Sequence, residues 1–324
     1  MSVVEAPSDT HMTSGRLGGR FRLDERISVG DRISGACVAS WGLSLWKATD
    51  ELLGRPVTIY LLPAGQPVPP GVVEAVQAAA KVCDPRLATI YDTDFSADGP
   101  YVVSEWAPGT HLEDLVLSGL PAPALAAAMI ADAADALAVA HQAGRPHLRL
   151  TPRSLRWDPR TGLKITGLGL DAALCGPVGA VDEDPMLADT RALARMLYAL
   201  LTGFWPGPDA TALPPAPRHK GRVCTPRQVR AGVPAILDAI TYQALRGQAP
   251  DAPARPLAPA GLAMALRGVQ RPSIRLVEAC DVGARDVDAR EPVQPFEPAG
   301  RPRARHARAR EGLLHRTTLL RPAV

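Results

Sequence analysis

The chain has 324 residues, of which 46% are hydrophobic, and its formal net charge is +3. This length suffices for one large two-lobed domain or two small ones, and the nearly balanced charge argues against a specific nucleic-acid-binding protein. The five cysteines are scattered and form no C-x-x-C pair. That spacing excludes the usual zinc motifs and favours buried, reduced thiols in the cytosol.

The N-terminal segment is polar and has no apolar run, so no signal peptide is expected there. We predict that residues 1–17 are disordered. The longest apolar stretch, residues 121–140, carries Asp132 and Asp135. It therefore predicts a buried helix rather than a membrane span. These features favour a cytoplasmic protein.

Residues 18–107 are predicted to form a strand-rich unit. Short apolar runs at 57–62 and 100–103 are rich in β-branched and aromatic residues, which is typical of strands. Between them, residues 70–82 have the apolar spacing of a helix. We expect one helix packed against a small sheet.

Residues 108–269 have helical character. Residues 122–143 are apolar almost all round, so this helix is predicted to lie at the centre of the unit. Further helical patterns follow at 111–117, 188–202, 233–246 and 257–267. Residues 270–324 are rich in proline and then in arginine, and they predict a linker followed by a basic, disordered tail.

Several short strings, in chain order, resemble bacterial Ser/Thr protein kinases. They correspond to the second strand, the turn after the small-lobe helix, the hinge, the helix before the catalytic loop and an Arg-Pro pair near the end. The strings cover residues 45–50, 84–87, 104–109, 138–144 and 254–256. The resemblance spans about residues 20–268. It implies an α+β, two-lobed protein-kinase-like fold with a small β-rich N-lobe and a larger helical C-lobe.

The resemblance also implies a phosphate-binding lysine on the third strand, where this chain has Tyr60. A phenol carries no positive charge at pH 7, so that contact to phosphate is lost. The glutamate that pairs with the lysine falls at Ala75, with Glu74 adjacent. Neither choice forms the usual ion pair with Tyr60.

The catalytic loop of the family is replaced at its reactive positions. The general-base aspartate is Arg149, the lysine two residues later is Thr151, and the metal-binding asparagine is Ser154. The metal-binding aspartate of the Asp-Phe-Gly motif is Gly167. Because Mg²⁺ requires anionic oxygen ligands, these replacements predict the loss of phosphoryl transfer.

Two questions about the cleft stay open at this point. Asp158 and Asp171 are the nearby carboxylates that could substitute for the missing ones. The positions that surround adenine in the family are Thr58, Ser104 and Arg156. We expect Arg156 to face solvent and the nucleotide pocket to be collapsed or filled.

Three positions that support the kinase fold are kept. The resemblance implies that His147 packs beneath the catalytic loop and that Asp189 accepts backbone hydrogen bonds from it. Arg255 is expected to form a structural ion pair with an acidic residue of the short activation segment. All three roles stabilise the scaffold and imply no catalysis.

The sequence therefore predicts a catalytically inactive kinase-like domain, a pseudokinase that is not an enzyme and that binds no cofactor or metal. It would act as a signalling scaffold or regulator, and the resemblance to actinobacterial domains links it to cell-envelope control. The alternative is an atypical Ser/Thr kinase or a nucleotide-binding sensor that retains binding of ATP and Mg²⁺.

The expected partners are proteins and an anionic surface. Thr317 and Thr318 are a candidate phosphosite for an active kinase, to be read by a phosphothreonine-binding domain. The basic tail is a candidate for binding an anionic membrane, which would make the cytoplasmic protein membrane-associated. Its arginines are Arg301, Arg303, Arg305, Arg308 and Arg310. No specific nucleic acid is expected.

Overall fold

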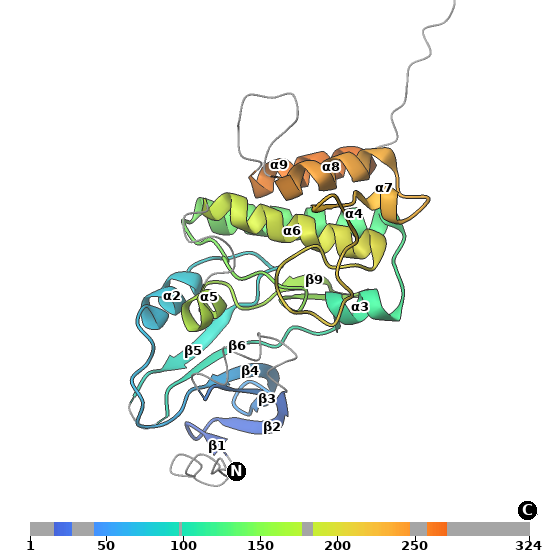
Figure 1. Cartoon of the computed structure of the whole chain (residues 1–324). Coiled ribbons are helices and arrows are strands. Elements are labelled where there is room, and N and C mark those ends of the chain that lie inside the picture. The colour runs from blue at the N-terminus through green and yellow to red at the C-terminus, as the bar shows by residue number, and fades with distance from the viewer. Residues whose placement is uncertain (1–15, 28–41, 97–98, 177–183, 247–257, 271–324) are drawn as a thin grey trace, which may run out of the picture. The chain divides into compact units, whose positions relative to one another are not determined.

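The computed structural model describes residues 16–27, 42–96, 99–176, 184–246 and 258–270. The chain divides into two units, residues 1–273 and 274–324. All of the described residues belong to the first unit, which Figure 1 shows in colour.

Six strands among the described residues form one antiparallel sheet, in the order β1-β2-β3-β4-β6-β5. The central strands β4 and β6 each bury four consecutive residues, and successive side chains belong to two separate apolar clusters, one on each face of the sheet. The strands are β1 (Arg16–Leu17), β2 (Phe21–Ile27), β3 (Ser44–Asp50), β4 (Arg55–Leu61), β5 (Ile90–Asp94) and β6 (Tyr101–Glu105). Helix α2 (Val72–Ala79) buries Val72 and Val76 in the same apolar cluster as β4 and β6.

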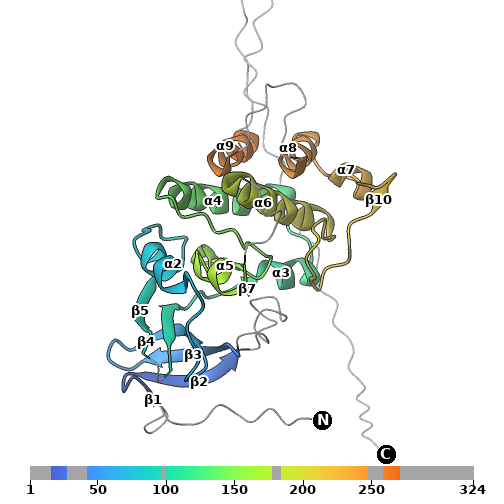
Figure 2. The same ribbon diagram turned by 60° about the vertical axis from the view of Figure 1, so that its left-hand side comes forward.

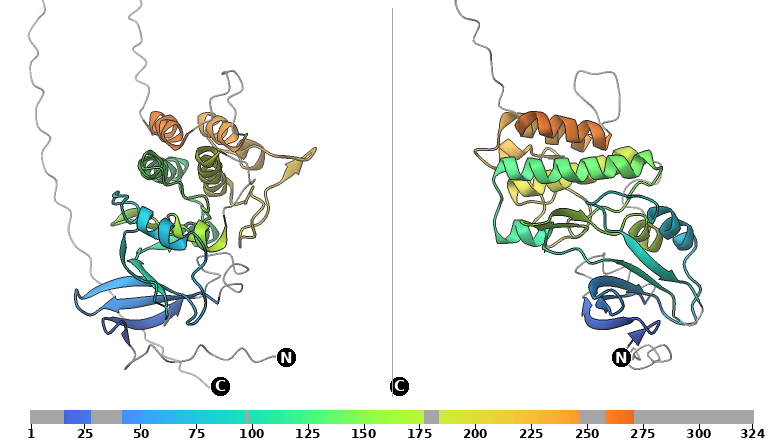
Figure 3. Two further views of the ribbon diagram at one scale, coloured as in Figure 1. Left: turned by 90° about the vertical axis from the view of Figure 1, so that its left-hand side faces the viewer. Right: turned by 180° about the vertical axis from the view of Figure 1, so that it is seen from behind.

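The helices that follow surround α4 (Pro123–Gln142), which is alanine-rich and buried on most of its surface. Small side chains let neighbouring helices approach closely, and α4 contacts both α6 (Pro185–Thr202) and α9 (Pro259–Gln270). Helices α4, α6, α8 and α9 lie together in both views of Figure 3. The remaining helices are α3 (Leu112–Ser118), α5 (Leu170–Cys175), α7 (Pro226–Val229) and α8 (Ala235–Arg246).

Two small sheets complete the described structure. Strands β7 (Thr110–His111), β8 (Leu155–Asp158) and β9 (Gly162–Ile165) form one, and they frame the loop that precedes β8. Strands β10 (Arg218–His219) and β11 (Arg222–Val223) form a separate hairpin.

The predicted α+β architecture is confirmed, with a curled antiparallel sheet followed by helices. Element ends differ by a few residues, as for the predicted helix 70–82, which is observed at Val72–Ala79. Arg16 and Leu17 lie within the predicted disordered terminus but form β1, because Leu17 is buried in the sheet core. The lobe boundary at residues 107/108 stays a prediction, and the tail lies outside the described residues.

The thiols differ from the expectation of buried, inert cysteines. Cys83 is free and exposed, and Cys224 is free and half-buried. Cys175 is disulfide-bonded. Scattered spacing in the sequence could not reveal this pairing, because the fold brings distant segments together.

Within the described residues, α4 is the one helix that is long and apolar enough to cross a membrane by length and composition. Over half of its apolar window, 56%, is buried inside the protein. The helix packs against α6 and α9, as expected for the central helix of a folded domain.

Candidate functional site: the cleft between the sheet and the helices

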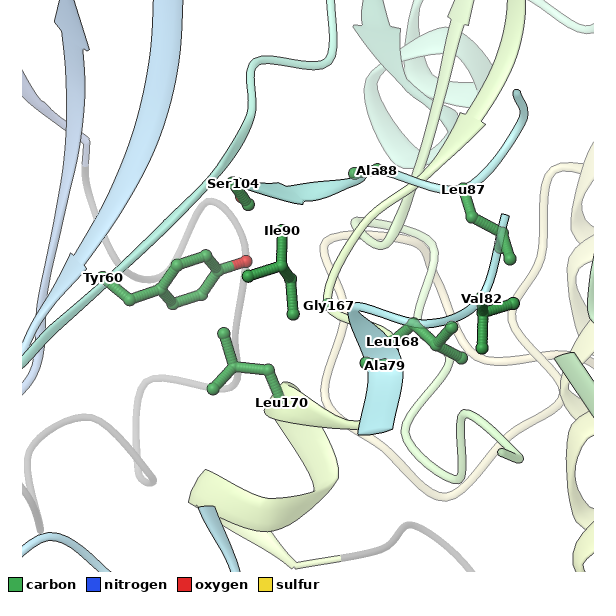
Figure 4. Close-up of a pocket in the computed structure, with 10 residues that line it drawn as sticks. All are labelled: Tyr60, Ala79, Val82, Leu87, Ala88, Ile90, Ser104, Gly167, Leu168 and Leu170. Atoms are coloured by element: carbon green, nitrogen blue, oxygen red, sulfur yellow. The ribbon is translucent and has the colours of Figure 1, made fainter. Parts of the chain in front are cut away.

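The centre of the cleft is apolar and is organised around Tyr60 on β4. This residue is 2% exposed and belongs to a cluster with Leu45, Val76 and Leu170. Figure 4 shows its ring pointing between Ile90 and Leu170. The space left at this point is about 10 Å³, close to the volume that one water molecule requires. The position of the family's lysine is therefore filled by packed side chains.

Helix α2 meets the start of α5 through its backbone. A side chain on Gly169 would come within 3.4 Å of the carbonyl oxygen of Ala75. Gly169 has a φ of +70°, which a residue with a side chain rarely adopts. Ala75 thus lies at a close contact between the two helices, while Glu74 is exposed.

The carboxylate of Asp171 occupies the place that a side chain on Gly167 would fill. A Cβ atom on Gly167 would overlap the Asp171 carboxyl group, and Gly167 has a φ of +84°. Asp171 is 4% exposed and lies one helical turn after Gly167, whose carbonyl oxygen accepts its N–H. A carboxylate from four positions later thus lies beside the backbone of Gly167.

Asp158, the other carboxylate considered from the sequence, has a local role. Its Oδ1 accepts the backbone N–H groups of Arg160 at 2.8 Å and Thr161 at 3.1 Å. These hydrogen bonds lower the pKa of Asp158 and close the turn between β8 and β9. It therefore belongs to the hairpin and not to the cleft.

Arg149, at the position of the catalytic base, binds the C-terminal end of α5. Its Nη1 donates to the carbonyl oxygens of Cys175 at 3.1 Å and Gly176 at 2.7 Å. The last carbonyls of a helix lack partners within the helix and carry partial negative charge, which a guanidinium stabilises. The cation holds the helix that carries Asp171.

The side chain of Ser154 forms hydrogen bonds within a turn of the loop. Its hydroxyl accepts the N–H of Thr151 at 3.1 Å and lies 3.5 Å from the carbonyl oxygen of Arg149. Ser154 is 1% exposed. The two residues that replace a lysine and a metal-binding asparagine thus stabilise the loop itself.

The base of the loop is a buried hydrogen-bond network. Asp189 on α6 accepts the backbone N–H groups of His147 and Leu148, both at 2.8 Å, and contacts Nε2 of His141 at 2.7 Å. Nδ1 of His147 accepts the N–H of Arg149, so its Nε2–H donates to the carbonyl oxygen of Thr166 at 3.0 Å.

Burial is the main cause that lowers the pKa of His147, and the nearby Asp189 partly opposes it. The ring is therefore neutral, as the hydrogen bonds require. Leu148 has a φ of +61°, an uncommon backbone conformation for a residue with a branched side chain. Its hydrogen bond to Asp189 compensates for the strain.

The three positions that surround adenine in the family lie on β4, β6 and β8. Thr58 and Ser104 are buried and face each other across β4 and β6. Arg156 is half-buried instead of facing solvent, which corrects the expectation. It donates to Nε2 of His111 at 2.8 Å and to the carbonyl oxygen of Gly109 at 2.6 Å. These hydrogen bonds draw the guanidinium to β7.

The described residues do not fit Mg²⁺ and ATP in the family's usual arrangement. No group of three or more His, Cys, Asp or Glu side chains among them could hold a metal ion. Asp171 is the carboxylate near the expected metal position, and Tyr60 replaces the phosphate-binding cation. Arg255, Thr317, Thr318 and the tail arginines lie outside the described residues, so their roles stay predictions.

Comparison with known proteins finds similarity to one class of protein, the Ser/Thr protein kinases. No family model matches the chain. A probable serine/threonine-protein kinase of Corynebacterium efficiens is 27% identical over 229 residues, which are 61% of this chain and 35% of that protein. The serine/threonine-protein kinase PknB of Mycolicibacterium smegmatis is 26% identical over 294 residues, covering 74% of this chain and 45% of the kinase.

PknB of Mycobacterium tuberculosis is also 26% identical, over 264 residues that cover 72% of this chain and 40% of the kinase. The chain thus spans less than half the length of these relatives. The fold and the loop define a protein-kinase-like domain. Its sequence is similar to Ser/Thr protein kinases of actinobacteria.

The prediction that the chain is not an enzyme is wrong on this comparison. The relatives are named Ser/Thr protein kinases, so the class that the chain resembles is an enzyme class. That prediction depended on the residues that occupy the family's catalytic positions, each considered separately. The side chain of Asp171, four residues along the chain, lies beside Gly167 and is not at one of those positions.

Proposed function

We propose that the chain is an atypical Ser/Thr protein-kinase-like domain that binds a nucleotide between its lobes. The observation that supports this proposal best is the carboxylate of Asp171 at the place of a Gly167 side chain. The names of the relatives make ATP the class of ligand to test. Asp171 would accept hydrogen bonds from hydroxyl or amino groups of that ligand, because its negative charge repels the phosphates, and we derive no transfer step from the residues present.

Nucleotide binding requires the packed cleft to open. The space beside Tyr60 is about 10 Å³, whereas ligand sites usually measure hundreds of Å³. The contact between α2 and α5 at Gly169 closes this region. We therefore expect weak binding, because part of the binding free energy is spent on opening the cleft.

Thermal unfolding of the purified chain tests the proposal. Millimolar ATP, with and without Mg²⁺, should raise Tm, because a ligand that binds the folded state stabilises it by mass action. Each kcal/mol corresponds to about 2–4 °C for a chain of this size. Asp171→Asn should reduce the shift, whereas the exposed control Glu74→Gln should leave it unchanged.

Transfer of labelled phosphate from ATP to the chain or to a generic substrate measures activity in the same preparations. The absence of both a Tm shift and phosphate transfer at millimolar ATP would contradict the proposal. A shift without transfer supports the nucleotide sensor rather than the kinase.

A second candidate is a signalling scaffold or regulator. The observation that favours it is the apolar filling around Tyr60, which stabilises one closed arrangement of the cleft. This candidate predicts a protein partner whose binding is unaffected by ATP. Pull-down with the purified chain, with and without millimolar ATP, distinguishes the two candidates.

A further inference from the structure

A cavity of about 340 Å³ lies among the helices, where α6, α8 and the β10–β11 hairpin meet. Figure 2 shows this hairpin beside α7, away from the six-stranded sheet. Arginines from all three elements line the cavity: Arg195, Arg218, Arg222 and Arg246. The residues that line it within the described part of the chain include no carboxylate.

The hydrogen bonds that Arg218 and Arg246 donate leave their positive charges unneutralised. Nη1 of Arg218 donates to the carbonyl oxygen of Gly221 at 3.3 Å, and Nη1 of Arg246 donates to the hydroxyl of Tyr242 at 2.6 Å. Both acceptors are uncharged. In the part of the chain that the structure describes, Arg218, Arg222 and Arg246 form no ion pair. All three are exposed and can reach a ligand.

The acidic residue on the adjacent helix is engaged elsewhere. Oδ1 of Asp238 on α8 accepts the backbone N–H of Arg227 at 2.7 Å, at the start of α7. The β10–β11 turn adds Lys220 to the basic surface, and its exposed side chain continues the same charge. The region therefore has a strongly positive potential around a concave surface.

The chemistry of the cavity matches a phosphate monoester attached to a short apolar stem. A guanidinium binds phosphate oxygens through two parallel hydrogen bonds, a geometry that an ammonium group cannot provide. The walls between the arginines are partly apolar, formed by Val223, Pro226 and Leu245. We propose that this cavity binds a phosphorylated serine or threonine side chain of a partner polypeptide.

The shape of the site favours a polypeptide over other anions. At about 340 Å³ the cavity is at the small end of ligand sites, enough for one side chain with its phosphate. A flat bilayer surface cannot place several headgroups in a concave site of this size. The cavity lies outside the interlobe cleft, so the proposal does not depend on nucleotide binding.

Fluorescence anisotropy with the full chain tests the proposal. The probe is a short fluorescein-labelled peptide of glycine and alanine around one phosphothreonine, compared with the same peptide carrying threonine or glutamate. The phosphothreonine peptide should bind at least about tenfold more tightly than either, because its phosphate carries about two negative charges and three acceptor oxygens. Inorganic phosphate at millimolar concentration should compete.

Variants locate the site. Arg218→Ala and Arg222→Ala together should weaken binding of the phosphothreonine peptide by at least about tenfold, since each removes a charge-assisted hydrogen-bond donor. Arg222→Lys should restore only part of the affinity. Arg160→Ala, on the exposed β8–β9 turn, is the matched control and should bind like the unmodified chain. Circular dichroism checks that each variant is folded.

Three results would overturn the proposal. One is equal affinity for the phosphorylated and unphosphorylated peptides. Another is unchanged affinity in the double variant when it is folded. The third is co-sedimentation with phosphatidylglycerol vesicles in the absence of any peptide binding, which would assign the arginines to a lipid surface.

Discussion

The two sides of the loop that contains Arg149 differ in how closely they keep the arrangement of the kinase family. Beneath it, Asp189 and His147 form a closed set of buried hydrogen bonds, in the arrangement that the kinase resemblance implies. Above it, Tyr60 fills the cleft with apolar packing, and Arg149 binds a helix end. Loss of one member of a buried polar network greatly lowers the stability of the fold, because its partners are left without hydrogen bonds. An apolar cleft tolerates substitutions that keep its packed volume.

The largest effect is expected beneath the loop. Asp189→Ala leaves the N–H groups of His147 and Leu148 and the ring of His141 without their shared acceptor. We expect the free energy of unfolding to fall by about 3–5 kcal/mol, as for removal of one member of a buried polar set. Urea unfolding followed by circular dichroism measures it.

Glu74→Gln on the exposed face of α2 is the control for Asp189→Ala, and it should change stability by less than about 0.5 kcal/mol. If Asp189→Ala lowers the free energy of unfolding by less than about 1 kcal/mol, the buried network is not the more sensitive side of the loop.

Restoring the family's lysine above the loop should destabilise the protein. Tyr60→Lys places an ammonium group among Leu45, Val76 and Leu170, and we expect a cost of about 3 kcal/mol. Tyr60→Met keeps an apolar side chain and should cost less than about 1.5 kcal/mol. Thermal denaturation of the two variants compares them. If the lysine variant is as stable as the methionine variant, the cleft tolerates charge.

Mild acid should lower the free energy of unfolding through His147, at a pH above the range in which carboxylates titrate. Burial lowers the pKa of His147 from its ordinary value of 6.5, so the unfolded chain binds a proton that the folded chain excludes. The stability that this residue contributes is complete above that pH and is lost as the pH falls below it. The expected slope is about 1.4 kcal/mol per pH unit.

Urea unfolding between pH 7.5 and 5.5 measures this slope. His147→Gln removes the titrating group and should make the curve flatter over the same range. An equal slope in both proteins would assign the acid sensitivity to another histidine.

The smallest effect is expected at the end of α5. Arg149→Met removes the bonds to the carbonyl oxygens of Cys175 and Gly176, with an expected cost of about 1 kcal/mol. Hydrogen exchange should show faster exchange of amides in α5 and unchanged exchange in α6. Uniform loosening of both helices would mean that Arg149 supports the whole loop rather than one helix.

The sequence predicts the architecture because short β-branched runs indicate the strands of the first lobe, a long alanine-rich apolar stretch indicates helix α4, and the kinase resemblance implies the two-lobed fold. It also singles out Tyr60, Arg149 and Gly167, since each departs from a short recognisable string. It does not predict which residues these side chains, or those of Arg156 and Asp171, contact in the folded protein. Arg156 turns to His111, and Asp171 reaches the place of a Gly167 side chain, through tertiary contacts between separate elements.

The arginine cavity leaves a weaker signal in the sequence. Arg218 and Arg222 are close in the chain, and Lys220 and Gly221 between them suggest a basic turn. Arg195 and Arg246 come from two distant helices, so only the packing of α6 against α8 brings them to the same cavity. No local pattern encodes that meeting point.

The covalent state of Cys175 has a practical consequence for work at the bench. This residue ends the same short helix that carries Asp171, and it is half of a disulfide. Dithiothreitol in a purification buffer reduces that disulfide, and its omission preserves it. Preparations made with and without reductant are therefore two chemical species, and ligand titrations should be run on each.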